Sequence, residues 1–459
     1  MKFGRKKTKT GRTGKDSELK GLDKAVELAT RGSDIYDSGT VRGESYEGMR
    51  CIFNPVYCFY GFIVSVTLLT FIGLTMVYSS SSVSLLSFGE DPWTKGFSQT
   101  VYAGIGFFAA LAASMLKADF YKRISGWLLV GATIFQGLTV TVFGHSAGGH
   151  AGWVNVAGLP VQPAEFLKCA ICLSLPYVLI NASEEARKAG KKRRELNIDV
   201  NKPFGGGPDG KSYQDNSLSK KALLPYAAPI FIFVVCFIAI MLGKDLGTAM
   251  IILIMGVSLL FVAGISWRWL ASVTVVSGCI ILLANVIFNS NRMVRILAAY
   301  SSCSADDVEG VCWQAIHGNY ALASGGMFGL GLGNSREKWS YLPAAQTDFI
   351  LAVIGEELGF VGVCCVILLF IVFAWCIFNM AMRHPVPYNR LVMTVIGVWI
   401  VAQALVNIFV VAGYLPVMGL PLPFISYGGS SIIMCLAASG VCLAMAKDQP
   451  EIASALKRK

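Results

Sequence analysis

Three carboxylates lie close together in the second half of one stretch of this chain, SGGMFGLGLGNSREKWSYLPAAQTDFILAVIGEELG at 324–359. Asp348 begins an apolar segment that also carries Glu356 and Glu357. Acids inside such a segment are costly to bury and usually functional. Asp348 fits two roles: a carboxylate stabilised by a helix dipole, or a general base that takes a proton from a substrate hydroxyl. Glu356 lies roughly 12 Å further along a helix, too far for a tight acid pair, so Glu356 and Glu357 are expected to anchor a polar network between helices.

An acid and a base occur together in the segment QPAEFLK at 162–168. Glu165 and Lys168 are three residues apart, so they share one helix face and are expected to pair. Such a buried pair either stabilises helix packing or lines a polar cavity for an anionic head group. Asp245, in the sequence KDLGT, has the position of an N-cap for the helix that follows, and it is a candidate substrate-binding residue.

The segment GYLPVMGLPLPFISYGGSS at 413–431 contains too much Pro and Gly for a plain helix. Non-helical backbone at membrane depth occurs only where protein or a watery cavity satisfies its polar groups. The segment is therefore expected to re-enter the membrane and line a site. Ser426 and Ser430 are its candidate substrate-binding residues.

The elements that position these residues are predicted to be membrane helices. Hydrophobic residues make up 54% of the 459 residues, charged residues make up 15%, and the mean hydropathy is +0.58, which is unlike a soluble domain. Lipid cannot satisfy an open sheet edge, so the predicted fold class is an all-α polytopic membrane protein. Ten stretches have spanning length, at 56–79, 98–116, 125–143, 162–182, 223–241, 246–264, 267–288, 348–378, 389–413 and 424–446.

The distribution of basic residues predicts the orientation of these helices. Lys and Arg are concentrated in the first 50 residues and in 183–222, whereas 144–161 and 414–423 contain none. The positive-inside rule then places both termini in the cytoplasm. The predicted parts are a disordered basic tail at 1–52, a ten-helix membrane domain at 53–447 and a cytoplasmic C-terminal tail at 448–459. Within the membrane domain, one cytoplasmic loop is expected at 183–222 and one long extracellular loop, between helices 7 and 8, at 289–347.

Few cations are expected on the outer side. Those in the long outer loop are Arg292, Arg295, Arg336 and Lys338. Cations held there against the charge bias suggest an anion to bind, and diphosphate is a natural candidate. Solvated loop charges explain each of them equally well.

Several classes of function find no support in the residues. The net charge of +11 follows from topology, so contact with anionic membrane lipid is expected and nucleic-acid binding is not. The chain has no Walker loop, zinc motif or Ser-His-Asp arrangement, so the residues point to no definite cofactor, and a divalent cation, Mg²⁺ or Mn²⁺, stays open. Cys303 and Cys312 both lie in the outer loop, where an oxidising milieu would allow a disulfide.

Five blocks in order, spread over residues 55–447, resemble the SEDS family of shape, elongation, division and sporulation proteins, which includes FtsW and RodA. The resemblance is closer to the division members, because of KWSYLP, IGEELG and the basic N-terminal tail. Ala344 and Gln346 depart from the Glu and His of the family pattern L-P-E-x-H-T-D, and Lys244 replaces the Pro before D-L-G-T. The blocks are MVYSSSS at 76–82, VQPAEFLK at 161–168, KDLGTA at 244–249, the stretch at 324–359 described above, and LPVMGLPLPFISYGGSS at 415–431.

This resemblance implies the SEDS fold and a peptidoglycan glycosyltransferase that polymerises lipid II with a class B penicillin-binding protein. The family's essential aspartate maps onto Asp348, and its Glu and Lys of the fourth helix map onto Glu165 and Lys168. A glycosidase needs two carboxylates, whereas lipid II already carries a diphosphate leaving group that cations stabilise. One base that activates the acceptor hydroxyl is then sufficient, and inversion at the donor carbon gives a β-1,4 linkage. Other division proteins are further implied partners, and the division septum of the bacterial cytoplasmic membrane is the expected location.

Other functions fit the same pattern. A lipid II flippase is one, because broken helices and intramembrane charges also suit transporters. A non-catalytic scaffold that recruits a transpeptidase is another. A RodA-like elongation polymerase is the close alternative to a septal one.

Overall fold

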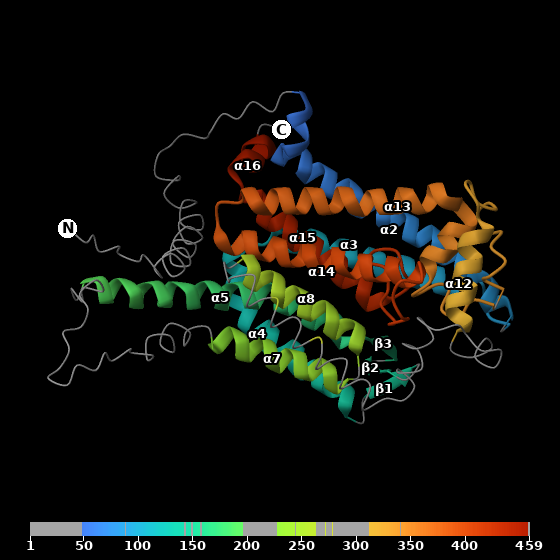
Figure 1. Cartoon of the computed structure of the whole chain (residues 1–459), viewed down its shortest axis with the longest axis horizontal. Helices are drawn as coiled ribbons and strands as arrows, with labels where there is room; N and C mark the ends of the chain where they lie inside the picture. The colour runs from blue at the N-terminus through green and yellow to red at the C-terminus, as the bar shows by residue number, and fades with distance from the viewer. Residues whose placement is uncertain are drawn as a thin grey trace, which may run out of the picture.

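Figure 1 shows the computed structural model as a bundle of long helices that run side by side. The structure describes residues 48–87, 89–141, 144–147, 150–156, 158–195, 227–243, 245–262, 271, 278, 312–339 and 341–457. The helices of the bundle are α2 (Pro55–Ser87), α3 (Thr94–Met115), α4 (Ala118–Gly137), α5 (Pro163–Glu195), α7 (Ala227–Leu242), α8 (Leu246–Val262), α13 (Ile350–Arg383), α14 (Pro387–Val411) and α15 (Gly429–Lys447). Short helices flank them: η1 (Gly48–Phe53), η2 (Leu138–Val140), α12 (Trp313–Ser324) and α16 (Pro450–Lys457).

The bundle has the composition of a multi-pass membrane protein. Six of its described helices, α2, α3, α5, α13, α14 and α15, are long and apolar enough to cross a membrane, and α7 and α8 are shorter apolar helices. Large apolar side chains such as Phe108 and Trp127 lie exposed on the outside, as expected where lipid replaces water. The predicted span at 267–288 lies outside the described residues except for single positions, so the count of ten stays a prediction.

The third predicted span, 125–143, is displaced towards the N-terminus, since α4 begins at Ala118. Its first turn carries Asp119 and Lys122, which form an exposed ion pair at 2.9 Å. Charged residues had excluded this turn from the apolar stretch. They are compatible with a helix end in contact with water.

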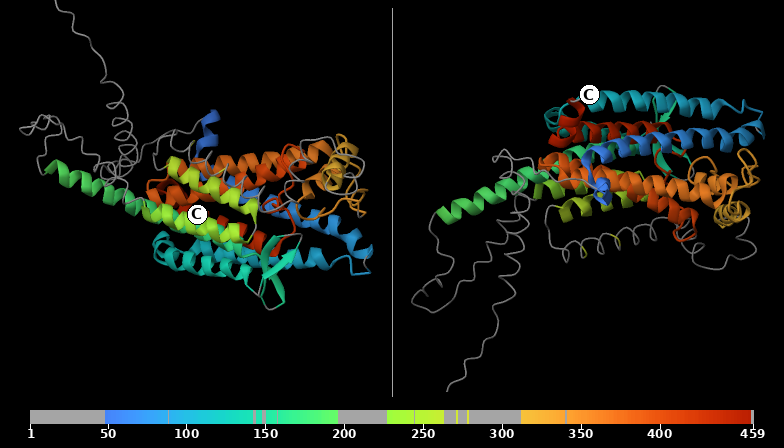
Figure 2. Two further views of the ribbon diagram at one scale, coloured as in Figure 1. Left: turned by 60° about the horizontal axis from the view of Figure 1, so that its bottom comes forward. Right: turned by 90° about the horizontal axis from the view of Figure 1, so that it is seen from above.

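A small sheet adds to the helical fold. β1 (Gly144–Ala147), β2 (His150–Val156) and β3 (Leu159–Val161) pair antiparallel in that order, which differs from the all-α expectation. The sheet lies with α12 at one end of the bundle, opposite to α16 (Figure 1), and we call this the α12 end. The views in Figure 2 agree. Lipid cannot form hydrogen bonds with an open strand edge, but beyond the end of the helices water can do so.

α13 is broken near its beginning. Gly359 has φ 71° and ψ −170°, a conformation in the left-handed region that favours glycine. In an unbroken helix, Phe360 and Val361 would donate to the carbonyls of Glu356 and Glu357. Here those two carbonyls instead accept Leu330 N and Gly331 N at 2.9 and 3.0 Å, while Phe360 N and Val361 N donate to Gly326 O and Met327 O at 2.9 and 3.1 Å.

The loop that enters this break, residues 326–331, is called the strap below. Glycines let it approach, because a Cβ at Gly329 would lie 2.2 Å from Glu357 O. Two hydrogen bonds within the helix are thus replaced by four hydrogen bonds between the strap and α13. The first turns of α13, which follow Asp348, are therefore fixed by the strap as well as by the helix.

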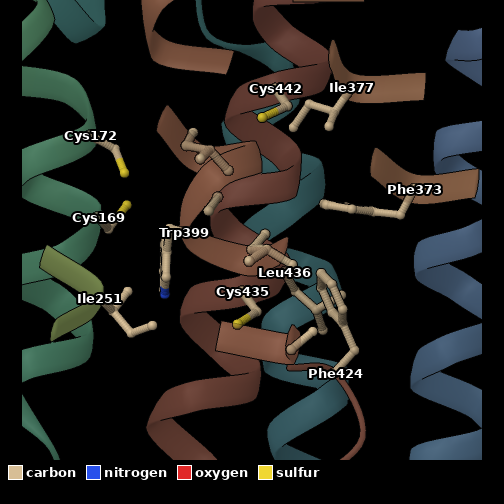
Figure 3. Close-up of a cluster of buried hydrophobic side chains, with 14 of the residues drawn as sticks. Cys169, Cys172, Ile251, Phe373, Ile377, Trp399, Phe424, Cys435, Leu436 and Cys442 are labelled. Carbon is tan, nitrogen blue, oxygen red and sulfur yellow. The ribbon is translucent and has the colours of Figure 1, made fainter. Parts of the chain in front are cut away.

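The core is apolar and closely packed. Figure 3 shows Trp399 of α14 between α5, which carries Cys169 and Cys172, and α15, which carries Cys435. These side chains are at least 94% buried. α3 and α15 approach so closely that a Cβ at Gly440 would lie 2.2 Å from Ala110 O.

Candidate active site

Asp348 lies half-buried in a turn just before α13, in the segment that α12 contacts. The carbonyls of three consecutive residues, Gln346, Thr347 and Asp348, each accept a hydrogen bond from a distant segment. In that order, the donors are the backbone N–H of Tyr427 at 2.9 Å, Ser426 Oγ at 2.6 Å and Asn407 Nδ2 at 2.8 Å. Tertiary contacts therefore fix the backbone on which Asp348 stands.

The chain reverses direction shortly before Asp348. Ala344 has φ 56°, in the left-handed region that is unfavourable for alanine. Its carbonyl accepts the N–H groups of Thr347 and Phe349 at 3.0 and 3.3 Å. Gln346 contributes its backbone carbonyl to the contact with Tyr427, so this contact does not depend on the replacement of His by Gln.

α12 holds the other side of this segment. Trp313 Nε1 donates to Tyr341 O, and Gln314 Nε2 donates to Pro343 O at 3.1 Å. The carbonyls before the turn are therefore bound by α12. Those within it are bound by α14 and the loop after α14.

The loop after α14, residues 412–428, has no helix, so the prediction of a non-helical segment is confirmed. Leu422, Phe424 and Ile425 are buried in it. We call residues 412–428 the re-entrant loop, from the role predicted for it. Side chains satisfy part of its backbone, as in the bond from Leu422 N to Ser426 Oγ at 2.7 Å, because buried non-helical backbone needs partners.

Both candidate serines have partners within the protein. Ser426 Oγ links the re-entrant loop to Thr347 O, and Ser430 Oγ accepts the backbone N–H of Gln162 at 3.3 Å. Both are buried. In this structure they support neighbouring segments, and their contact with a substrate stays a prediction.

The predicted pairing of Glu165 with Lys168 is confirmed. Lys168 Nζ donates to Glu165 Oε1 at 2.9 Å and to Gln403 Oε1 at 2.8 Å, and it lies 4.9 Å from the centre of the Trp399 ring. The side chains of Glu165 and Lys168 are 1% and 0% exposed. Within the described residues, Glu165 Oε2 is buried without a hydrogen-bond partner. A buried charge of this kind is tolerated only when it is paired.

Asp245 is the predicted helix cap. Its carboxylate accepts Thr248 N at 2.9 Å and Thr248 Oγ1 at 2.8 Å, the geometry of an N-cap. Gln162 Nε2 also donates to Asp245 Oδ2 at 3.3 Å. Asp245 thereby connects the first turn of α8 to the beginning of α5.

Glu356 and Glu357 anchor a polar network, as predicted. Glu356 accepts Ser335 Oγ and Arg336 N. Glu357 accepts Ser79 Oγ of α2 at 2.7 Å and pairs with Lys338 Nζ at 2.9 Å. Both glutamates are completely buried, so the network ties α2, α13 and the segment after the strap together.

Lys338 differs from the expectation of an outer-surface cation. It is 3% exposed, and its ammonium donates to Glu357 Oε1, Ser79 Oγ and Gly333 O. The ammonium's three protons are therefore used within the protein. Arg336 is exposed. Arg292 and Arg295 lie outside the described residues, as does Cys303, while Cys312 is disulfide-bonded.

The sequence reasoning missed two amides of α14, Gln403 and Asn407. They are four residues apart on one face, in the second half of α14, where the neighbouring residues are apolar. Both are buried, and both donate to the re-entrant loop, at Pro421 O and Leu420 O respectively. Polar residues one turn apart inside an apolar helix were the available signal.

Comparison with known proteins gives consistent matches. Residues 60–451 match the family model FTSW_RODA_SPOVE, described as cell cycle protein. The probable peptidoglycan glycosyltransferase FtsW of Bacillus subtilis (strain 168) is 31% identical over 395 residues, which cover 83% of this chain and 89% of that protein. Stage V sporulation protein E of the same organism is 33% identical over 386 residues, which cover 83% and 94%.

Two solved structures share the fold. The crystal structure of the rod shape determining protein RodA of Thermus thermophilus has a TM-score of 0.56 at 23% identity, covering 85% of this chain and 97% of that one. A chain in the structure described as "Structural coordination of polymerization and crosslinking by a peptidoglycan synthase complex" has a TM-score of 0.62 at 22% identity, covering 85% and 97%.

Proposed function

The chain belongs to the FtsW/RodA/SpoVE family, the SEDS proteins, and from this premise we propose that Asp348 is its catalytic base. The protein is a peptidoglycan glycosyltransferase, the activity named for FtsW relatives that are 30–31% identical over most of the chain. The observation that carries the proposal is the turn before α13, where three consecutive carbonyls are bound and the carboxylate of Asp348 stands half-buried.

The reaction joins lipid II units into β-1,4 glycan strands. Asp348 removes the proton from the acceptor sugar hydroxyl, and the oxygen attacks the anomeric carbon of the donor. The bond from that carbon to the diphosphate breaks, and undecaprenyl diphosphate leaves with the electron pair. Because the diphosphate is already a good leaving group, no acid partner is needed, and attack from the opposite face inverts the donor carbon.

Cations stabilise the departing diphosphate. Arg336, Arg292 and Arg295 are the candidates, and the engagement of Lys338 with Glu357 makes it the weakest of the four proposed. Among the described residues, no three His, Cys, Asp or Glu side chains come together. If a Mg²⁺ or Mn²⁺ ion takes part, Asp348 and the oxygens of the diphosphate itself would hold it.

The proposed setting is the cytoplasmic membrane at the division septum, with ten spans and both termini in the cytoplasm. The Lys and Arg distribution supports this orientation. A class B penicillin-binding protein is the proposed partner. In support, one structure of the same fold belongs to a peptidoglycan synthase complex, and the FtsW names of the relatives favour division over elongation.

The test gives lipid II in detergent to the purified protein with its penicillin-binding partner. A flippase produces nothing there, because detergent has no two sides. We expect glycan chains from wild type and none from Asp348→Asn. The matched control is Asp119→Asn, which changes an exposed carboxylate in the first turn of α4 and should leave the chains unchanged. Chains that persist in Asp348→Asn would refute the base, and an inactive wild type would favour a flippase or a scaffold.

A further inference from the structure

Asn407 of α14 contacts the Asp348 turn directly, and we infer that it is a positioning residue for Asp348. The inference rests on the proposed function. Asn407 Nδ2 donates one proton to Asp348 O and the other to Leu420 O, both at 2.8 Å. Its side chain is 1% exposed, so no water replaces these bonds if the amide is removed.

The two carbonyls that Asn407 joins belong to segments far apart in the sequence. One is the turn before α13 and the other is the re-entrant loop, and neither is helical at this point. Their relative position depends on tertiary hydrogen bonds rather than on a helix ladder. A shift of the Asp348 carbonyl also moves the carboxylate, because both are attached to the same Cα.

Gln403, one turn earlier on α14, connects the re-entrant loop to Lys168. Its Nε2 donates to Pro421 O at 2.9 Å, and its Oε1 accepts Lys168 Nζ. The consecutive carbonyls of Leu420 and Pro421 are thus bound by two amides of one helix. Asn407 bonds to Asp348 O and Gln403 bonds to Lys168 Nζ, so α14 itself links the Asp348 turn to the Glu165–Lys168 pair.

This arrangement matters for rate rather than for substrate binding. Displacement of a catalytic group by about 1 Å lowers the rate on the order of 100-fold. Asn407→Leu has a similar shape and no donor. We expect it to lower kcat for lipid II polymerisation by about 10- to 100-fold and to leave KM within about twofold.

The matched control is Thr394→Val. Thr394 lies on the same helix and is buried, and within the part of the chain that the structure describes its hydroxyl bonds only to the backbone of its own helix, at Arg390 O. This control should retain wild-type kcat. Asn407→Leu leaves two buried carbonyls without this donor, so its thermal unfolding midpoint should fall, and kcat is compared at a temperature where both variants stay folded. An unchanged kcat in Asn407→Leu would overturn the inference. A loss that appears only as a raised KM would also overturn it, because Asn407 would then act on substrate binding rather than on the position of Asp348.

Asn407→Asp supplies a readout that a merely structural role would not move. A carboxyl donates a hydrogen bond only when it is protonated, so its kcat relative to wild type should exceed that of Asn407→Leu and should not fall as the pH is lowered. Equal losses in both variants at every pH would show that the donor is not what matters. Asp348→Asn is measured alongside: polymer from that variant refutes the base itself, whereas an inactive Asp348→Asn with a wild-type-like Asn407→Leu refutes only the positioning role.

Discussion

At the scale of single residues, spacing along the chain correctly predicted contacts between residues that are close in sequence. Glu165 and Lys168 pair because they are three apart on a helix, and Asp245 caps the helix that follows it. The hydrogen-bond partners of Asp348 and Lys338 that are distant in the chain could not be predicted from the sequence. Asn407 is 59 residues from Asp348, and Ser79 is 259 residues from Lys338. The surroundings of these side chains follow from the assembled bundle, so the sequence could not distinguish a surface lysine from a buried one.

The buried Glu165–Lys168 pair leads to a prediction about stability. Lys168→Met leaves the Glu165 carboxylate buried without its cation, and removing one member of a buried pair costs about 3–5 kcal/mol. We expect a clear fall in the thermal unfolding midpoint in detergent. In the double variant Lys168→Met with Glu165→Gln, most of the midpoint should return, because no charge is then left unpaired. A single variant as stable as wild type would contradict the pairing.

At the scale of elements, the sequence predicted where helices lie better than how they are interrupted. The stretch 348–378 reads as one continuous span, yet α13 is broken at Gly359. The signal was present in the glycines of the strap and in Gly359. These glycines allow the strap and α13 to come into contact, and the periodicity of either segment alone does not reveal that contact.

Gly359→Ala tests the break in α13. The new Cβ would lie 2.3 Å from Gly329 N at a φ of 71°, so left-handed strain and steric overlap together should cost about 2–5 kcal/mol. We expect a lower unfolding midpoint and loss of polymerisation. The control Gly131→Ala places a Cβ in open space on α4 and should be neutral or slightly stabilising. Equal behaviour of the two variants would show that the break is not required.

The turn between α13 and α14 predicts a pH effect. His384 is buried, its Nδ1 accepts Val386 N at 3.1 Å, and its Nε2 lies 3.0 Å from Met445 O. Because a backbone N–H can only donate, the neutral ring carries its proton on Nε2 and donates to Met445 O. Burial lowers the pKa of His384. The hydrogen bonds to Met445 and Val386 and the charge of Asp448 oppose it with smaller effects, and Arg390 adds the smallest effect, which is again a lowering.

As the pH falls, His384 therefore binds a proton in the unfolded chain at a higher pH than in the folded protein. Stability should be fully present above the unfolded pKa of about 6.5 and should fall as the pH drops below it. Thermal unfolding of the detergent-solubilised protein between about pH 5 and 8 measures this. His384→Gln should flatten the part of the curve due to this group. An identical pH dependence in both proteins would assign the effect elsewhere.

At the scale of the whole molecule, apolar length was the strongest predictor. Every predicted span that falls within the described residues corresponds to a helix there, α2 to α5, α7, α8 and α13 to α15. The small sheet and α12 were not predicted. They lie at one end of the bundle (Figure 1), where the constraint that lipid places on the backbone no longer applies.

Topology is tested by labelling intact cells. Trp339 is 63% exposed in the segment after the strap, and Leu456 is 37% exposed on α16. A membrane-impermeant maleimide should label Trp339→Cys above the wild-type background. Leu456→Cys should be labelled only after permeabilisation. The reverse pattern would invert the proposed orientation.

The strap determines the order in which the membrane domain can be built. Its residues precede α13 in the chain and, in the proposed orientation, are carried across the membrane as part of the outer loop. The ribosome therefore makes the strap before the helix that it enters. α13 can first insert as a continuous helix in which Phe360 and Val361 bond to Glu356 and Glu357, and then exchange these bonds for those of the strap. No backbone group is then left unpaired in lipid, and the turn that carries Asp348 reaches its final form only after both parts have been inserted.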